Sequence, residues 1–181
     1  MNAEARLPPV TLVLGGQRSG KSHYAESLCE GQAGPCLYLA TAEAGDAEMA
    51  ARIAAHQARR GSRWQTHEEP LALVAALQRM AGPGRAVLVD CLTLWLSNLL
   101  AAGRDPGAEG DKLLAVLTDL KGPLVLVANE VGLGIVPDNA LARAFADQAG
   151  QLNRKIAGAA QAVVFMAAGL PLSLKTWQET D

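Results

Sequence analysis

The segment from Val10 to Glu30 constrains the fold of this chain more than any other part of the sequence. An apolar run at 10–14 is followed by Gly15-Gly16-Gln17-Arg18-Ser19-Gly20-Lys21-Ser22, and a stretch of helical character continues to Glu30. The eight central residues match G-x-x-x-x-G-K-[ST], the phosphate-binding loop that connects a strand to a helix. Glycines let backbone N–H groups approach phosphate oxygens, and the helix N-terminus adds positive potential. The segment therefore predicts a P-loop nucleotide site.

The rest of the chain alternates strand-length apolar runs with segments of helical period. We expect further strands at 36–40, 64–67, 86–89, 124–128, 162–167 and 172–174, and helices at 22–30, 46–60, 70–80, 92–102, 111–120 and 140–160. The polar stretch 103–110 is expected to be a loop. Continuous apolar strands separated by helices predict a mostly parallel sheet covered on both faces. The predicted fold class is α/β, a single P-loop domain over residues 1–181 whose sheet is flanked by helices.

Composition and charge exclude several classes of protein. Half of the 181 residues are apolar, and 16 Lys and Arg against 18 Asp and Glu give a formal net charge of −2. This balance lacks the basic excess of a non-specific nucleic-acid binder, so we expect no nucleic-acid partner. Cys29, Cys36 and Cys91 do not have the spacing of a zinc site or a disulfide framework. Because we recognise neither a signal peptide nor a membrane-spanning run, we expect a cytoplasmic protein without a membrane span.

Three side chains in and near the P-loop have the chemistry of phosphoryl transfer. Lys21 would contact the β- and γ-phosphates, and Ser22 would hold Mg²⁺. Asp90 follows the predicted strand at 86–89, where a carboxylate can order the water shell of the metal. An Asp at the end of a strand is also a frequent helix N-cap, so this second interpretation of Asp90 stays open. Arg18 either contacts phosphate or is a solvated loop residue.

A second candidate site lies on the predicted helix at 46–60. At helical spacing His56 shares a face with Arg52 and Arg60, and Arg59 follows it by three residues. These arginines lower the pKa of the imidazole and would gather phosphate groups around it. A neutral imidazole beside a nucleotide α-phosphate is a competent nucleophile. A lone histidine on a helix is more often structural or exposed, and the residues alone leave both interpretations open.

Five blocks of sequence together resemble a known family. They are 15–22, Tyr-Leu-Ala-Thr-Ala-Glu at 38–43, Glu-Met-Ala-Ala-Arg-Ile at 48–53 with His56 beyond it, Val-Asp-Cys-Leu-Thr-Leu-Trp at 89–95, and Asn-Glu-Val-Gly-Leu-Gly-Ile-Val-Pro at 129–137. In order and spacing they resemble the bifunctional adenosylcobinamide kinase / adenosylcobinamide-phosphate guanylyltransferases of cobalamin biosynthesis. The resemblance covers nearly the whole chain, and it implies a RecA-like P-loop sheet and assembly as a homo-oligomer, with a trimer expected.

The resemblance also implies two reactions on a small-molecule corrinoid substrate. Such enzymes phosphorylate adenosylcobinamide with GTP or ATP, take GMP from a second GTP onto a histidine, and pass it to adenosylcobinamide phosphate. The products are adenosylcobinamide-GDP and pyrophosphate. By its position in the motif, His56 would carry the GMP, and the family's further nucleotide contacts fall on Thr41, Ala42, Glu43, Gln57, Ala58, Arg59, Arg60, Glu68 and Asp90. The expected cofactors are GTP, ATP and Mg²⁺, with Ser22 and Asp90 at the metal, partly through water.

Three other functions match parts of the sequence. The chief alternative is a P-loop small-molecule kinase without a covalent nucleotidyl step, in which His56 is structural. A RecA-like ATPase acting on nucleic acid is disfavoured by the net charge. A nucleotide-binding protein without catalysis is disfavoured because Lys21, Ser22 and Asp90 are all present.

Five further side chains carry weaker expectations. Asn129 and Glu130 are expected to end a strand on the P-loop side, where they can contact a γ-phosphate or an acceptor hydroxyl. Trp64 and Trp95 are expected to serve in packing. His23, which directly follows Ser22, is expected at the surface.

Overall fold

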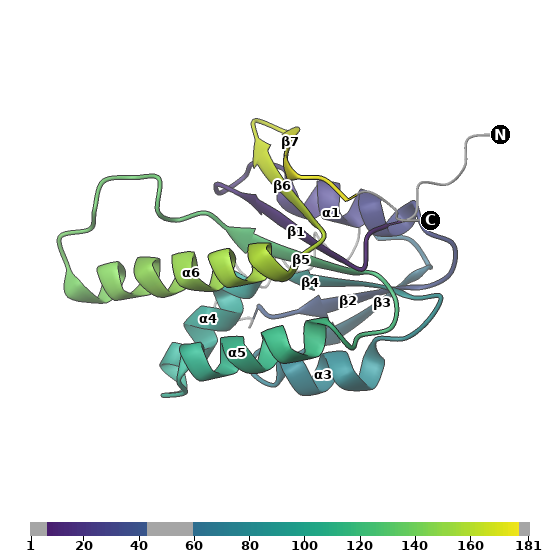
Figure 1. Cartoon of the computed structure of the whole chain (residues 1–181), viewed down its shortest axis with the longest axis horizontal. Coiled ribbons are helices and arrows are strands. Elements are labelled where there is room, and N and C mark those ends of the chain that lie inside the picture. Colours follow the sequence, from purple (N-terminus) through teal and green to yellow (C-terminus); the bar gives the residue numbers. More distant parts are fainter. Residues whose placement is uncertain (1–6, 43–59, 178–181) are drawn as a thin grey trace.

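A seven-stranded sheet organises the part of the chain that the computed structural model describes, residues 7–42 and 60–177 (Figure 1). Its strands are β1 (Val10–Gly15), β2 (Cys36–Ala40), β3 (Trp64–Glu68), β4 (Ala86–Asp90), β5 (Leu124–Asn129), β6 (Ala162–Ala167) and β7 (Leu170–Lys175). They lie in the order β3-β2-β4-β5-β1-β6-β7, and every neighbouring pair is parallel except β6 and β7. The prediction of a mostly parallel sheet is confirmed.

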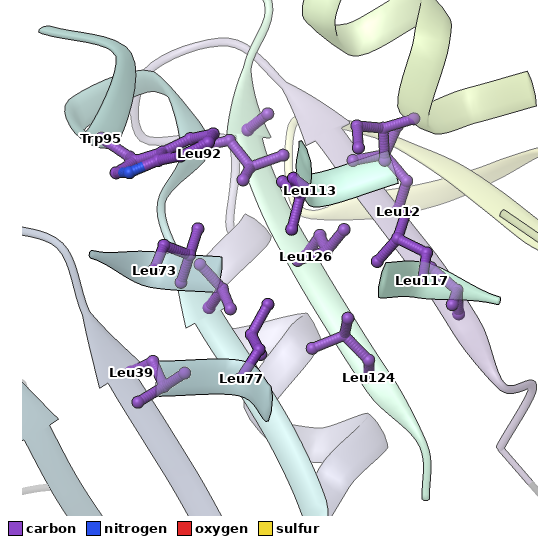
Figure 2. Close-up of a cluster of buried hydrophobic side chains, with 14 of the residues drawn as sticks. Leu12, Leu39, Leu73, Leu77, Leu92, Trp95, Leu113, Leu117, Leu124 and Leu126 are labelled. Atoms are coloured by element: carbon purple, nitrogen blue, oxygen red, sulfur yellow. The ribbon is translucent and has the colours of Figure 1, made fainter. Parts of the chain in front are cut away.

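The strands bury side chains on both faces of the sheet, because successive residues point to opposite sides. On one face, Leu12 and Leu126 join a cluster with residues of α3 (Leu73–Met80), α4 (Leu92–Ala101), α5 (Pro106–Leu117) and α6 (Ala140–Ala159), as Figure 2 shows. On the other face, Val13 and Val125 pack with residues of α1 (Lys21–Glu30). Within the described ranges, no helix is long and apolar enough to cross a membrane.

The carboxyl ends of three strands meet at one edge of the sheet. Gly15 at the end of β1 pairs with Asn129 at the end of β5, and Asp90 at the end of β4 pairs with Val127. Because β5 lies between β1 and β4, the loops that follow all three strands emerge side by side. This edge is where open α/β sheets bind their ligands.

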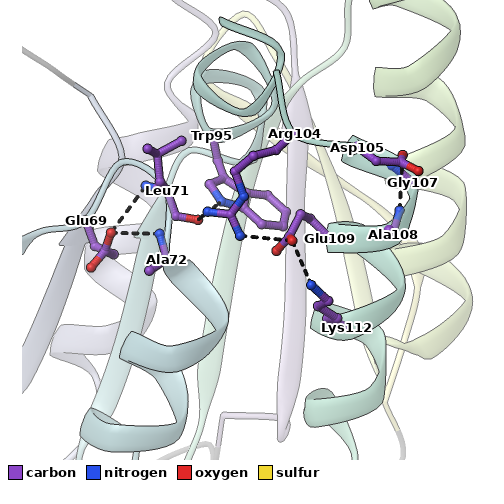
Figure 3. Close-up of polar contacts among 10 residues, drawn as sticks. All are labelled: Glu69, Leu71, Ala72, Trp95, Arg104, Asp105, Gly107, Ala108, Glu109 and Lys112. Carbon is purple, nitrogen blue, oxygen red and sulfur yellow. Dashed lines mark hydrogen bonds and ion pairs between the residues drawn. The ribbon is translucent and has the colours of Figure 1, made fainter. Parts of the chain in front are cut away.

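Two helices, α5 and α3, begin at residues other than those that the sequence predicts. Residues 103–110 were expected to be a loop, but α5 begins at Pro106. The side chain of Asp105 accepts hydrogen bonds from the N–H groups of Gly107 at 2.8 Å and Ala108 at 3.3 Å, which caps this helix (Figure 3). An N-cap Asp followed by Pro at the first helical position is a start signal that glycine content obscured.

The second difference is at α3, which begins at Leu73 rather than at residue 70. A Glu69 side-chain oxygen accepts hydrogen bonds from the N–H groups of Leu71 and Ala72 and holds the chain in a turn before the helix. The helix expected at 46–60 lies outside the described residues except for Arg60.

A charged cluster ties α5 to the connection that precedes it (Figure 3). Glu109, whose side chain is largely buried, pairs with Arg104 at 2.9 Å and with Lys112 at 2.8 Å. Arg104 also donates to the carbonyl of Leu71, which accepts a second hydrogen bond from the indole of Trp95. The hydrogen bond from Lys112, followed by the one from Arg104, lowers the pKa of Glu109 against the opposing effect of burial.

We expect Glu109→Gln to lower the free energy of unfolding by about 1 kcal/mol at pH 7, because it removes a charge-assisted contact that is partly screened by solvent. A carboxylate whose folded pKa is depressed stabilises the protein above its unfolded pKa, and this contribution is lost as the pH falls through the folded value. Urea unfolding at pH 7 and pH 3 measures the effect. A difference of equal size at both pH values would show that the charge of Glu109 is not what stabilises the cluster.

Candidate active site

The P-loop follows β1 and is packed tightly against β6. A Cβ on Gly15 would lie 2.5 Å from the carbonyl oxygen of Met166 and 2.7 Å from Oγ of Ser19, so only glycine fits there. Gly20 has a φ of 94°, in the left-handed region that favours glycine, and it precedes the first turn of α1. The N–H of Gly169, in the β6–β7 turn, donates to the carbonyl of Ser19 at 3.1 Å. The outer hairpin therefore supports the loop from outside.

The functional groups of the loop are placed as a phosphate site requires. The side chain of Lys21 is buried and its Nζ donates to the carbonyl of Gly16 at 2.5 Å, so it lies along the loop. Ser22 is half-buried in the first turn of α1, and no described side chain caps that helix. The N–H groups at the start of a helix without a side-chain cap are a favourable site for an anion. Gln17 and Arg18 are exposed.

Asp90 lies at the carboxyl end of β4, and it does not cap the helix that follows. Cys91 occupies the N-cap position of α4, and no side-chain capping hydrogen bond is formed there. The N-cap interpretation of Asp90 is therefore wrong. Instead, Oδ2 of Asp90 accepts a hydrogen bond from the hydroxyl of Tyr38 at 2.9 Å.

The charges of Asp90 and Lys21 both influence the pKa of Cys91. Burial, followed by the charge of Asp90, raises the pKa of the Cys91 thiol to about 12, and the charge of Lys21 opposes this rise. Both charged groups are thus close enough to Cys91 to influence it, in keeping with the packing of α1 against β4 and β5. Cys91 itself stays a neutral thiol near pH 7 and is not a nucleophile.

The oxygen groups at this edge fit Mg²⁺ that is shared with a nucleotide. Ser22 offers a hydroxyl and Asp90 a carboxylate, both hard oxygen donors. Among residues 7–42 and 60–177, no group of three or more His, Cys, Asp or Glu side chains is placed to hold a metal. Mg²⁺ usually binds through one or two protein oxygens, substrate phosphates and water rather than in a complete protein cage, so this sparse set of donors suits it.

Two residues without a predicted role, Tyr38 and Glu26, contact predicted site residues. The guanidinium carbon of Arg60 lies 3.3 Å from the centre of the Tyr38 ring, in a cation–π contact. Nε of Arg60 lies 3.4 Å from a carboxylate oxygen of Glu26 on α1, and both side chains are largely buried. Tyr38 thus connects Asp90 at one end to the Arg60–Glu26 ion pair at the other.

The hydroxyl of Tyr38 keeps its proton. Burial raises the pKa of Tyr38, and the nearby charge of Asp90 raises it further. The tyrosine therefore remains a hydrogen-bond donor to Asp90 throughout the working pH range. The contact between Tyr38 and Asp90 depends on the register of β2 against β4. Ala40 pairs with Asp90, and Tyr38 lies two residues before Ala40 on the same face of the sheet. That register is not evident from one sequence.

The other predicted nucleotide contacts lie further along the same edge. Thr41 is buried; its hydroxyl donates to the carbonyl of Cys91 at 2.7 Å and accepts from the Cys91 N–H at 2.8 Å. Ala42 is half-buried beside it, and Glu68 is exposed at the end of β3. Since β3 is four strands from β1, Glu68 lies about 19 Å along the sheet from the P-loop strand. Glu43, His56, Gln57, Ala58 and Arg59 lie outside the described residues.

The end of β5 is joined directly to the P-loop. The N–H of Glu130 donates to the carbonyl of Gly15 at 3.0 Å, and the N–H of Asn129 donates to the hydroxyl of Thr93 on α4 at 2.7 Å. Asn153 on α6 donates to the carbonyl of Asn129 at 3.3 Å. The expectation that Asn129 ends a strand beside the P-loop is confirmed.

The expectations for the remaining aromatic and histidine residues are also met. Trp95 is fully buried in the core, and His23 is exposed. Trp64 packs edge-on against Tyr38, with ring centres 6.1 Å apart, and its indole N–H donates to Glu30 at 2.8 Å.

The fold is similar to that of two solved structures. The structure is similar to an ATPase from the type III secretion system of pathogenic bacteria, with a TM-score of 0.57 and 13% identity over 91% of this chain and 56% of that chain. A Pyrococcus horikoshii protein gives a TM-score of 0.56 at 8% identity, over 96% of this chain and 89% of that one. The predicted P-loop fold class is confirmed by these similarities, which at such low identity show the fold alone.

Sequence similarity is far more specific. The bifunctional adenosylcobalamin biosynthesis protein CobP of Pseudomonas aeruginosa is 51% identical over 166 residues, which cover 91% of this chain and 96% of that protein. The corresponding CobU proteins of Escherichia coli and Salmonella typhimurium are 38% and 39% identical, over 91% of this chain and 98% of each relative. Residues 11–174 match the family described as cobinamide kinase / cobinamide phosphate guanyltransferase. The chain therefore belongs to the cobinamide kinase / cobinamide phosphate guanyltransferase family.

Proposed function

We propose that this cobinamide kinase and guanylyltransferase uses the P-loop edge of the sheet for phosphorylation and His56 as the carrier of GMP. The observation that supports the proposal best is the meeting of the P-loop, Asp90 and Asn129 at the ends of three adjacent strands. In the kinase step, GTP or ATP phosphorylates the hydroxyl of adenosylcobinamide. In the transfer step, GMP passes from GTP through His56 to adenosylcobinamide phosphate, giving adenosylcobinamide-GDP and pyrophosphate.

The kinase step asks the chain to bind phosphates and to orient a hydroxyl. The uncapped first turn of α1 and the amide groups of the loop would bind the β- and γ-phosphates, with Lys21 across them. Ser22 and Asp90 would hold Mg²⁺, partly through water, and that ion neutralises charge on the phosphates when bound. Tyr38 keeps the carboxylate of Asp90 oriented. Asn129 and Glu130 are placed beside the loop, where the acceptor hydroxyl would arrive.

The transfer step proceeds by two displacements at phosphorus. A ring nitrogen of His56 attacks the α-phosphorus of GTP, a P–N bond forms, the P–O bond to the leaving group breaks, and pyrophosphate departs. A phosphate oxygen of adenosylcobinamide phosphate then attacks the same phosphorus, and the P–N bond breaks to free the histidine. The phosphoramidate is energetic enough to transfer GMP to a phosphate acceptor. Arg59 would neutralise charge on the departing pyrophosphate.

The remaining contacts in the nucleotide set are proposed from family membership. They comprise Gly15, Gly16, Gln17, Arg18, Ser19, Gly20, Thr41, Ala42, Glu43, Gln57, Ala58, Arg60 and Glu68. Arg60 and Thr41 are each held by neighbouring groups in this structure, so they are proposed to act where those groups place them. Assembly as a homo-oligomer, with a trimer expected, and a cytoplasmic location also stay predictions.

We expect Lys21→Ala to reduce phosphorylation of adenosylcobinamide by about 10²- to 10³-fold, because the variant loses a positive charge that stabilises the transferring phosphoryl group. The variant should still fold, because alanine is smaller than lysine and is well tolerated in a helix. Steady-state kinase assays and a thermal melt test this, with Lys121→Ala, an exposed lysine, as control. Near wild-type phosphorylation by Lys21→Ala would remove the P-loop from the mechanism.

We expect Tyr38→Phe to weaken the site for Mg²⁺-nucleotide by about tenfold, because Asp90 loses the hydrogen bond that orients it while the ring stays under Arg60. Calorimetric titration should show weaker binding of Mg·GTP and unchanged binding of GTP in the presence of a chelator. Tyr24→Phe is the matched control, since Tyr24 is half-buried on α1 away from this hydrogen bond. Equal weakening with and without Mg²⁺ would assign Tyr38 to packing alone.

We expect GTP labelled in the α-phosphate to label the protein covalently in the absence of any corrinoid. A histidine phosphoramidate survives alkali and is lost in mild acid, unlike a serine ester. The label should be absent from His56→Ala, whereas His23→Ala, a change at an exposed histidine, should retain it. His56→Ala should still phosphorylate adenosylcobinamide. An unlabelled wild type, or a label that persists in His56→Ala, would favour the kinase alternative without a covalent step.

A further inference from the structure

An unusually apolar surface begins directly after β5. Five large apolar side chains are exposed within eleven residues, namely Val131, Leu133, Ile135, Val136 and Leu141. In Figure 1 this connection between β5 and α6 extends away from the sheet before it returns to the start of α6. Large apolar side chains gathered on one surface mark a binding site in soluble proteins.

Part of this surface forms a wall of a groove between α4 and the start of α6. The groove has a cavity volume of about 840 Å³, and its apolar lining residues include Leu100, Val131, Pro137, Leu141, Phe145 and Ala146. That volume is within the range of small-molecule sites, about 300 to 1,000 Å³. None of its lining residues is charged, and the polar side chains among them are Ser97 and Asn139. The groove therefore suits a large apolar surface and not a nucleotide phosphate.

Hydrogen bonds hold the walls of this groove in place. Nη1 of Arg143 donates to the carbonyls of Pro137 at 2.9 Å and Asp138 at 2.6 Å, which ties the connection to α6. The side-chain oxygen of Asn139 accepts from the N–H of Ala142 at 2.7 Å and caps the same helix. The groove is thus a shaped surface of the fold.

The groove continues from the proposed kinase site. Val131 lines it and directly follows Glu130, whose N–H binds the carbonyl of Gly15 in the P-loop strand. On the other side, α4 carries both Leu100 in the groove and Thr93, which binds the end of β5. A bulky substrate bound in this groove would lie next to the end of β5. A side arm with a hydroxyl group could then extend from the groove toward the P-loop.

We propose that this groove binds the corrin ring of adenosylcobinamide and of its phosphate, a proposal that rests on the function proposed above. A corrin is a broad macrocycle with many methyl groups and with amide arms at its rim. Its apolar face matches the leucine, valine and phenylalanine walls, and its amides remain at the open rim, where they meet water. The same groove serves both reactions, because the two substrates share the corrin ring and differ only at the end of one side arm.

Two variants of the full chain test the proposal. Leu141→Asp places a charge in the groove, and Ala146→Trp fills it. Equilibrium dialysis, read by the visible absorbance of the corrinoid, should show affinity for adenosylcobinamide reduced by about tenfold or more. The affinity for GTP, the covalent label from α-labelled GTP and the sedimentation coefficient should equal those of the wild type.

Leu133→Asp is the matched control. Leu133 is as exposed as Leu141, 79% against 76%, but it does not line the groove, so this variant should bind the corrinoid normally. Unchanged corrinoid affinity in both groove variants, or an equal loss in Leu133→Asp, would overturn the proposal. A loss of affinity accompanied by a smaller sedimentation coefficient would also overturn it, by assigning the groove to contact between copies of the chain. A wild type that binds the corrinoid but neither phosphorylates it nor takes the label would instead refute the proposed function and leave the groove assignment intact.

Discussion

The pairing of β5 between β1 and β4 is the constraint on which the site depends. It sets the end of the P-loop strand beside Asn129 and brings Asp90 to the same edge. None of these groups is close to another in the sequence. Their arrangement follows from parallel strands whose carboxyl ends all face one way, so the buried apolar strands determine where the proposed phosphate-binding groups lie.

Much of this arrangement could be predicted from one sequence, and the reasons are local. The P-loop is a contiguous motif, and the strands are continuous apolar runs, so the sheet and its nucleotide edge follow from pattern. The contact of Tyr38 with Asp90 could not be predicted, because it depends on the register between two strands that are about fifty residues apart along the chain. The start of α5 is a different case, because the glycines of this segment favour a loop whereas the capping signal of Asp105 and Pro106 favours a helix.

Polar groups that follow β2 and β4 form hydrogen bonds with one another in addition to those of the sheet. The hydroxyl of Thr41 both donates to and accepts from the backbone of Cys91, and Asn98 on α4 donates to the carbonyl of Thr41 at 2.7 Å. Buried backbone groups that leave a sheet must find new partners, and these contacts supply them. The Asp90 carboxylate is thereby fixed from its backbone side by Thr41 and from its side-chain side by Tyr38.

The outer hairpin of β6 and β7 has a consequence for how this protein can vary. Its β7 strand is exposed along its whole length and lies at the edge of the sheet. Yet the carbonyl of Met166 occupies the space that a side chain on Gly15 would need, and the N–H of Gly169 donates to the carbonyl of Ser19. Residues near the C-terminal end of the described chain therefore form the back wall of a loop near its beginning. We therefore expect a change in the length of this hairpin to alter the shape of the P-loop.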